Sequence, residues 1–286
     1  MWSGQPPGGG GNRAKAAAIA AATTVVLTVG VAGFLLRDGG RNDIADGSRN
    51  AKAPTVASKR ATASASASGN PRGGQTVRPT VPGWKAVVDP EWGTAFDVPP
   101  DWDVKSSSLL IGFEDRKVDY SDPDNWDKVA VIMGAPAVLE ENWCRYRSKK
   151  NGRVKLNSTE LAATGTKGAK GAESTGAVAL SEAERWVYGG YTQPDTKSII
   201  RDRTAKPYTT RSGLKGSIAR ARSRNAPRED GCASDGKAIT FGFRNSTGGL
   251  VAWSLYGATG VKDELPDSTI MKILGTVRLH GNPTKS

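Results

Sequence analysis

Histidine is nearly absent from this sequence, which limits the chemistry that its side chains can perform. His280 is the single histidine among 286 residues and lies six residues from the C-terminus. Acid–base catalysis by histidine needs a pocket and an orienting partner, and triads of the Ser-His-Asp or Cys-His kind depend on it. We therefore predict no histidine-dependent catalytic residue and interpret His280 as an exposed residue of the C-terminal tail.

Two other residue patterns have the spacing of reactive groups. Ser212 and Lys215 match the Ser-x-x-Lys spacing that places a lysine beside a nucleophilic serine on a helix in penicillin-binding enzymes. Gly213 disfavours that helix and the companion motifs are missing, so we interpret the segment as a turn between strands. No dinucleotide or phosphate-loop signature occurs either. We predict no catalytic residue and no cofactor.

Acidic residues cluster in the middle of the chain, where hard cations could use their oxygens. Asp119, Asp122, Asp124 and Asp127 lie close together, but the segment lacks the glycine and distal glutamate of an EF-hand loop. Its Asp-Pro-Asp-Asn composition is typical of a turn. We therefore predict no metal site. An enzyme that uses carboxylates, from this cluster or from Glu114 and Asp115, remains an alternative.

A basic stretch between residues 197 and 228 holds ten Lys/Arg and a single Asp. Within it Arg220, Arg222 and Arg224 alternate with small residues, and a strand would place all three on one face. This Arg stripe is a candidate site for anionic polymer or lipid headgroups. The alternative is an edge strand whose charges prevent association of sheets. Only Tyr208 interleaves with these charges, so we predict no binding of nucleic acid.

Cys144 and Cys232 are the two cysteines and lie 88 positions apart. They could be separate buried thiols, but an extracytoplasmic setting favours a disulfide. A segment without charges, residues 16–36, is long enough to span a bilayer, and Arg13, Lys15 and Arg37 flank it. A cleaved signal peptide is the alternative. We predict a single-pass, signal-anchored protein, integral to the lipid bilayer of the cell membrane, whose C-terminal domain is extracytoplasmic.

Composition divides the chain into four parts. We expect a disordered cytoplasmic tail at residues 1–15, a transmembrane helix at 16–36, a low-complexity linker at 37–81 and a folded domain at 82–286. Of the net charge of +12, the first 81 residues contribute the larger part, with ten Lys/Arg against three Asp/Glu. The folded domain is therefore only mildly basic, which makes the overall charge weak evidence for any partner.

The elements of the folded domain are mostly short strands between Pro, Gly and Asp turns. A capping-box spacing of Ser181 and Glu184 predicts a helix over residues 180–191, and a last helix begins near Pro266. We predict an α+β fold, with an antiparallel sheet packed against helices. The predicted strands span residues 84–88, 94–98, 102–104, 109–114, 128–133, 217–223, 237–244 and 250–256.

Three segments resemble a family of uncharacterised actinobacterial single-pass membrane proteins: residues 92–102 (WGTAFDVPPDW), 232–237 (CASDGK) and 265–270 (LPDSTI). The opening strand, the Pro-x-x-Trp turn and the final helix are also similar to the PsbP-like fold and to LpqN-type mycobacterial lipoproteins. The resemblance implies a sheet packed against helices, and it implies no reaction.

We therefore expect a membrane-anchored protein whose extracytoplasmic domain is not an enzyme but binds or scaffolds at the cell envelope. Its partner would be an envelope protein or an anionic polymer. The alternatives are a binder of anionic wall polymer or lipid headgroups through Arg220, Arg222 and Arg224, and the carboxylate-based envelope enzyme described above.

Overall fold

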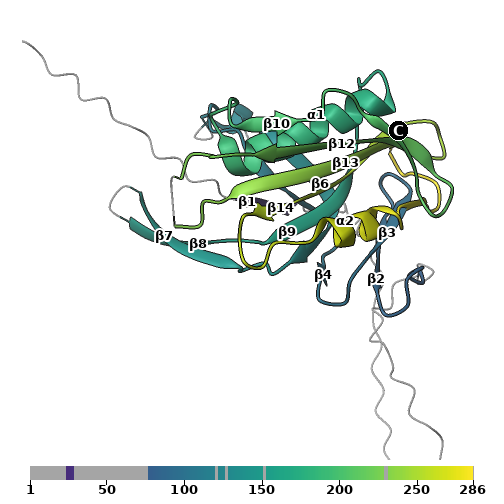
Figure 1. Ribbon diagram of the computed structural model, residues 1–286, viewed down its shortest axis with the longest axis horizontal. Coiled ribbons are helices and arrows are strands. Elements are labelled where there is room, and N and C mark those ends of the chain that lie inside the picture. Colours follow the sequence, from purple (N-terminus) through teal and green to yellow (C-terminus); the bar gives the residue numbers. More distant parts are fainter. Residues whose placement is uncertain are drawn as a thin grey trace, which may run out of the picture. The chain divides into compact units, whose positions relative to one another are not determined.

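One large antiparallel sheet dominates the protein (Figure 1). The computed structural model describes residues 24–28, 77–119, 122–125, 128–150, 153–228 and 231–285. The strand order is β1-β5-β6-β9-β14-β13-β12-β10, with β4 paired to β6 and β11 paired to β12. These ten strands are β1 (Thr24–Thr28), β4 (Asp103–Val104), β5 (Leu109–Glu114), β6 (Val129–Leu139), β9 (Ala162–Gly168), β10 (Ile199–Arg201), β11 (Lys206–Thr209), β12 (Lys215–Ser223), β13 (Asp235–Arg244) and β14 (Leu250–Thr259).

Two smaller antiparallel sheets and a few helical segments complete the described part. The first sheet has the order β15-β3-β2, and the second is the hairpin β7–β8. Their strands are β2 (Lys85–Asp89), β3 (Thr94–Val98), β15 (Arg278–Leu279), β7 (Cys144–Lys150) and β8 (Arg153–Thr159). The helical segments are α1 (Thr175–Val187), α2 (Asp267–Leu274), the 3-10 turn η1 (Pro123–Asn125) and the π-helical turn η2 (Tyr188–Thr192).

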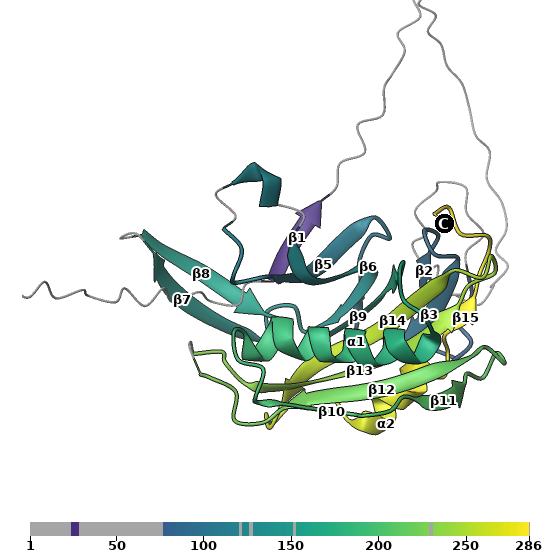
Figure 2. The ribbon, with the colours of Figure 1, turned by 90° about the horizontal axis from the view of Figure 1, so that it is seen from above.

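Both faces of the large sheet are covered by apolar side chains, because alternate residues of a strand point to opposite sides. Phe241 of β13 lies opposite Trp253 of β14, and both join the core that contains the buried residues of α2. Ala238 lies opposite Tyr256, three register positions further along, and both join the core beneath α1. Helix α1 packs against β12, β13 and β14, and Figure 2 shows it running alongside β12 and β13. The sheet is thus a central layer with one helix on each side.

Helix α1 approaches the sheet closely at a glycine. A Cβ atom at Gly242 would lie 2.2 Å from the carbonyl oxygen of Thr175, so only glycine fits there. The helix begins at Thr175, where the Ser174 hydroxyl accepts a hydrogen bond from the N–H of Ala177. The predicted helix start at Ser181 and Glu184 is therefore wrong. The N-cap is Ser174, seven residues before Ser181.

The predicted transmembrane helix at residues 16–36 is also wrong. Residues 24–28 (TVVLT) form β1, which pairs antiparallel with β5. Four of these five residues are β-branched, which favours a strand, and the edge of β5 supplies the hydrogen-bond partners. In the part of the chain that the structure describes, neither α-helix reaches the length and apolar character needed to cross a bilayer. Residues 16–23 and 29–36, the tail 1–15 and residues 37–76 of the predicted linker lie outside the described residues.

The predicted α+β class is wrong because strands make up most of the regular secondary structure and only two α-helices occur in the described chain. The prediction had one strand between residues 128 and 168, whereas the structure has four, β6 to β9. Strand β9 (AATGTKG) escaped notice because it has no large apolar residue. Its small residues are needed for packing, since a Cβ atom at Gly168 would lie 2.2 Å from the ring of Trp92.

The other predicted elements are confirmed, and most of their predicted ends lie within three residues of the observed ends. They correspond to β2, β3, β4, β5, β12, β13, β14 and α2, and the strand at 128–133 is the first half of β6. The apolar side of α2 carries Ile270, Ile273 and Leu274, which are buried against the sheet.

Candidate functional site

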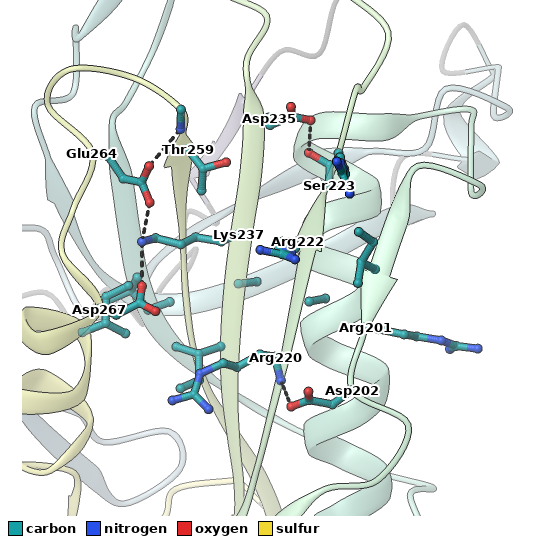
Figure 3. Close-up of a pocket in the computed structure, with 18 of the residues that line it drawn as sticks. Arg201, Asp202, Arg220, Arg222, Ser223, Asp235, Lys237, Thr259, Glu264 and Asp267 are labelled. Atoms are coloured by element: carbon teal, nitrogen blue, oxygen red, sulfur yellow. Dashed lines mark hydrogen bonds and ion pairs between the residues drawn. The ribbon is translucent and has the colours of Figure 1, made fainter.

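The predicted Arg stripe lies on a groove at the margin of the large sheet. The floor of the groove is the side of β12 and β13 that also carries α2, and its cavity volume is about 860 Å³. One wall is formed by β10 and Asp202, and the other by residues 259–264 and the beginning of α2. Figure 3 shows the side chains that line this groove. Segments that are far apart in sequence therefore meet at one site.

The alternation predicted for the stripe is confirmed. Arg220 and Arg222 are exposed residues of β12, and Arg224 is exposed directly after its end. Arg220 lies opposite Ile239 of β13, and Arg222 lies opposite Lys237. All of these side chains belong to the groove side of the sheet. Deeper in the groove the surface is apolar, with Ile239, Leu255, Ile270 and Met271.

Lys237 holds two of the four carboxylates that line the groove. Its Nζ lies 2.8 Å from Glu264 Oε1 and 2.7 Å from Asp267 Oδ1, and it also donates to the carbonyl oxygen of Leu265 at 2.8 Å (Figure 3). The backbone N–H of Gly260 donates to the other oxygen of Glu264. This network fixes the 260–265 loop and the first turn of α2 to the sheet.

The remaining two carboxylates are bound by neutral donors. Asp202 accepts a hydrogen bond from the backbone N–H of Arg220 at 2.9 Å. Asp235 accepts hydrogen bonds from the Ser223 hydroxyl at 2.8 Å and from the N–H groups of Asn225 and Ala226 at 3.2 and 3.0 Å. Neither carboxylate forms an ion pair with a guanidinium group of the stripe.

These hydrogen bonds keep two of the carboxylates ionised. Burial alone would raise the pKa of Asp235, but the hydrogen bonds from Ala226, Ser223 and Asn225 outweigh it, and the pKa is lowered. Burial likewise opposes ionisation of Glu264, but the Lys237 ammonium and the N–H of Gly260 lower its pKa. Both are therefore anions that have their own donors.

The guanidinium groups of the stripe have no such partners. Among the described residues, no carboxylate lies within ion-pair distance of Arg220, Arg222 or Arg224. Arg220 Nη2 lies 3.3 Å from the sulfur of Met271, which is a weak acceptor. A fourth arginine, Arg201, points away from the groove and pairs with Glu184 of α1. Three guanidinium groups thus remain available for an anion.

The predicted disulfide between Cys144 and Cys232 is present, with a Cα–Cα distance of 5.7 Å. It connects the first residue of β7 to the segment that precedes β13. The base of the β7–β8 hairpin is therefore bonded to the connection between two strands of the large sheet. The disulfide lies apart from the groove, because neither cysteine lines it.

The other residues considered from the sequence lie elsewhere. Ser212 is in the turn between β11 and β12, as predicted, and Lys215 is the first residue of β12. The Ser212 hydroxyl donates to the carbonyl oxygen of Val277. His280 follows β15 and is half-buried rather than exposed. Its N–H donates to the carbonyl oxygen of Gly93.

The acidic residues around η1 have turn roles where they are described. Asp122 Oδ1 accepts a hydrogen bond from the N–H of Asp124, and the carbonyl oxygen of Asp119 accepts one from the side chain of Asn125. Asp127 lies outside the described residues. Within the described ranges, no group of three or more His, Cys, Asp or Glu residues is placed to hold a metal ion.

A small polar cavity near the disulfide was not predicted. Its volume is about 60 Å³, room for a few water molecules, and Cys232, Tyr191 and Tyr256 are among its lining residues. Tyr256 donates a hydrogen bond to Glu160. Burial and the Glu160 carboxylate raise the pKa of both tyrosines well above that of a free phenol. The two phenols are thus protonated at neutral pH and cannot serve as bases.

Sequence reasoning also missed Asp235, Lys237, Glu264 and Asp267 as groove residues. Two of the motifs that we considered structural, residues 232–237 and 265–270, carry three of them. A lysine at the start of the apolar strand β13 was a usable signal, since such a residue needs charged partners nearby.

Comparison with known proteins gives a family for this chain. Among curated proteins, none matches it. Residues 77–282, well over half of the chain and all of the groove, match the family described as Domain of unknown function (DUF8017). The chain belongs to this family.

Proposed function

We propose that the domain is a binding module that holds an anionic ligand in the groove through Arg220, Arg222 and Arg224. A guanidinium group donates two parallel hydrogen bonds to a phosphate or a carboxylate, which makes arginine suited to such ligands. The groove volume of about 860 Å³ is in the range of ligand-binding sites. The ligand is therefore a molecule or polymer segment that carries several phosphate or carboxylate groups.

One observation carries this proposal: four carboxylates line the groove, yet none of them forms an ion pair with Arg220, Arg222 or Arg224. Asp202 and Asp235 are satisfied by backbone and hydroxyl donors, and Lys237 is the cation that pairs with Glu264 and Asp267. A purely structural surface would gain by pairing the arginines with these acids. The arginines are left for a ligand.

We also propose that the domain works in an oxidising compartment outside the cytoplasm. The Cys144–Cys232 disulfide supports this location, because such bonds persist where thiols are not kept reduced. Alkylation of intact cells tests it. Blocked cysteines are the expected result, and modification of both thiols without prior reduction would contradict it.

The binding proposal is tested by calorimetric titration of the full chain with tripolyphosphate, polyglutamate and glycerol phosphate. Tripolyphosphate and polyglutamate represent phosphate and carboxylate polymers, and glycerol phosphate represents a lipid headgroup. We expect Arg222→Gln and Arg224→Gln each to weaken binding of the preferred probe about tenfold, the loss of one charge-assisted hydrogen-bonded contact. Higher salt should weaken binding further.

Arg185→Gln is the matched control. Arg185 is an exposed arginine of α1, on the opposite face of the sheet from the groove. Its substitution should leave the affinity unchanged. The proposal is wrong if none of the three probes binds, or if Arg185→Gln weakens binding as much as the two groove substitutions do.

A further inference from the structure

The β7–β8 hairpin exposes two aliphatic side chains to solvent. Val154 and Leu156 have exposed fractions of 65% and 64%, the largest among the large hydrophobic residues of the described chain. The hairpin is a two-stranded sheet of its own and extends away from the large sheet in both ribbon views (Figures 1 and 2). Exposed aliphatic residues at the end of a projecting element indicate a contact surface.

The register of the hairpin places these residues among arginines. Arg147 lies directly opposite Leu156, and Arg145 lies two positions before it on the same face. Both arginines are exposed and have no ion pair among the described residues. Tyr146, one position away in the strand, points to the other face and is buried. One face of the hairpin is therefore both cationic and aliphatic.

The sequence of the hairpin has only one sign of charge. Residues 144–159, which include the turn, contain six Lys/Arg and no Asp/Glu. Two copies of this surface would repel each other, so a second copy of the chain does not fit it. A soluble polyanion would satisfy the cations but would leave Val154 and Leu156 in water.

We propose that this face of the hairpin binds the surface of an anionic lipid bilayer. At such a surface, phosphate groups lie directly above hydrocarbon, which matches cations beside aliphatic side chains on one face. The contact is peripheral, made by side chains of a hairpin, and it needs no spanning segment. The Cys144–Cys232 disulfide holds the base of the hairpin, so the aliphatic face has a fixed direction relative to the domain.

The test is co-sedimentation of the full chain with vesicles that contain phosphatidylglycerol and with vesicles of phosphatidylcholine alone. We expect binding to the anionic vesicles only, and we expect the double variant Val154→Ser/Leu156→Ser to bind them about tenfold less tightly, because its buried methyl groups are lost. Arg145→Gln/Arg147→Gln should show a similar loss, because these two side chains face the headgroups. Leu279→Ser, at a residue of β15 that is 40% exposed, is the matched control and should bind normally.

Thermal unfolding of each variant checks that the fold is intact, which is expected because the substituted side chains are exposed. Equal vesicle binding by the wild type and the Val154→Ser/Leu156→Ser variant would overturn the proposal. So would a loss that follows only the arginines, since that result indicates a purely electrostatic partner. Self-association that the serine variant abolishes, without vesicle binding, would assign the surface to a second copy instead.

Discussion

Arg222 of β12 lies directly opposite Lys237 of β13, so two cations are cross-strand neighbours on the groove side of the sheet. Like charges in this position destabilise an antiparallel pair. Lys237 is held by Glu264 and Asp267, whereas Arg222 has no carboxylate partner among the described residues. The pair concentrates positive charge at a place where stability alone would not require it, and an anion bound there would relieve the repulsion.

The first prediction concerns the stability of this pair. Arg222→Gln should raise the free energy of unfolding by about 0.2 to 1 kcal/mol, because a repulsive cross-strand contact is removed. Urea denaturation of the full chain measures it. Arg220→Gln is the control, because Arg220 lies opposite the apolar Ile239 and should give no gain. A loss of stability on Arg222→Gln would show that the arginine has a structural role.

The second prediction concerns Lys237. Lys237→Met leaves Glu264 and Asp267 without their cation beside the arginines, so the groove becomes more negative and anion affinity should fall about tenfold. Calorimetric titration with the best-bound probe measures the change. Adding Glu264→Gln should restore part of the affinity. Lys262→Met, at an exposed residue of the same loop, should leave it unchanged, and an equal effect of both lysine substitutions would contradict the role of the Lys237 network.

The third prediction concerns pH. Hydrogen bonds lower the pKa of Asp235 below its value in the unfolded chain, so this carboxylate stabilises the fold above the unfolded pKa of 3.8. That contribution is lost as the pH falls through the lower, folded-state pKa. The free energy of unfolding of the wild type should therefore decline more between pH 5 and pH 2, about the range of carboxylate titration, than that of Asp235→Asn. An equal decline of the unfolding free energy in the wild type and in Asp235→Asn would rule out this linkage. Asp101→Asn, at an exposed residue outside the groove, is the control substitution.

The fourth prediction concerns the disulfide. Replacing both Cys144 and Cys232 by alanine should lower the free energy of unfolding by about 2 to 4 kcal/mol, because an 88-residue loop is no longer closed in the unfolded chain. Thermal unfolding with and without reductant measures this. Reductant should destabilise the wild type and leave the double variant unaffected. Identical unfolding curves for oxidised and reduced wild type would contradict it.

The fifth prediction concerns the contact between α1 and the sheet. Gly242→Ala brings a methyl group to within 2.2 Å of the Thr175 carbonyl oxygen, so α1 must shift, at a cost of about 1 to 3 kcal/mol in unfolding free energy. Chemical denaturation measures the loss. Gly231→Ala is the control, because a Cβ atom there meets no other atom within 4 Å. A fully stable Gly242→Ala protein would mean that the helix can move away without cost.

The strands that the sequence predicts correctly are those with an alternating apolar pattern, such as β3 and β13, because burial on a face imposes that pattern. Strand β9 was missed because its role is to let Trp92 and Met133 approach, which small residues do without any apolar signal. The helix predicted over residues 16–36 was wrong at β1, where an available strand edge decided the conformation.

The Arg stripe was predictable because its three residues are neighbours in one strand. The acids around it were not, because Asp202, Glu264 and Asp267 come from other segments and reach the groove only through the strand order β14-β13-β12-β10. Similarly, the exposed face of the β7–β8 hairpin depends on the register of two strands that the apolar pattern does not reveal.

Because the groove joins residues from β10, β12, β13 and α2, no short fragment of the chain contains it, and it exists only while the whole sheet is intact. Any molecule that occupies it must therefore raise the melting temperature of the entire domain, by an amount that grows with the logarithm of its concentration. At a hundredfold excess over its dissociation constant, the gain is about 2.7 kcal/mol. A dye-based melting screen of anionic metabolites and polymers is thus a direct route to the natural ligand.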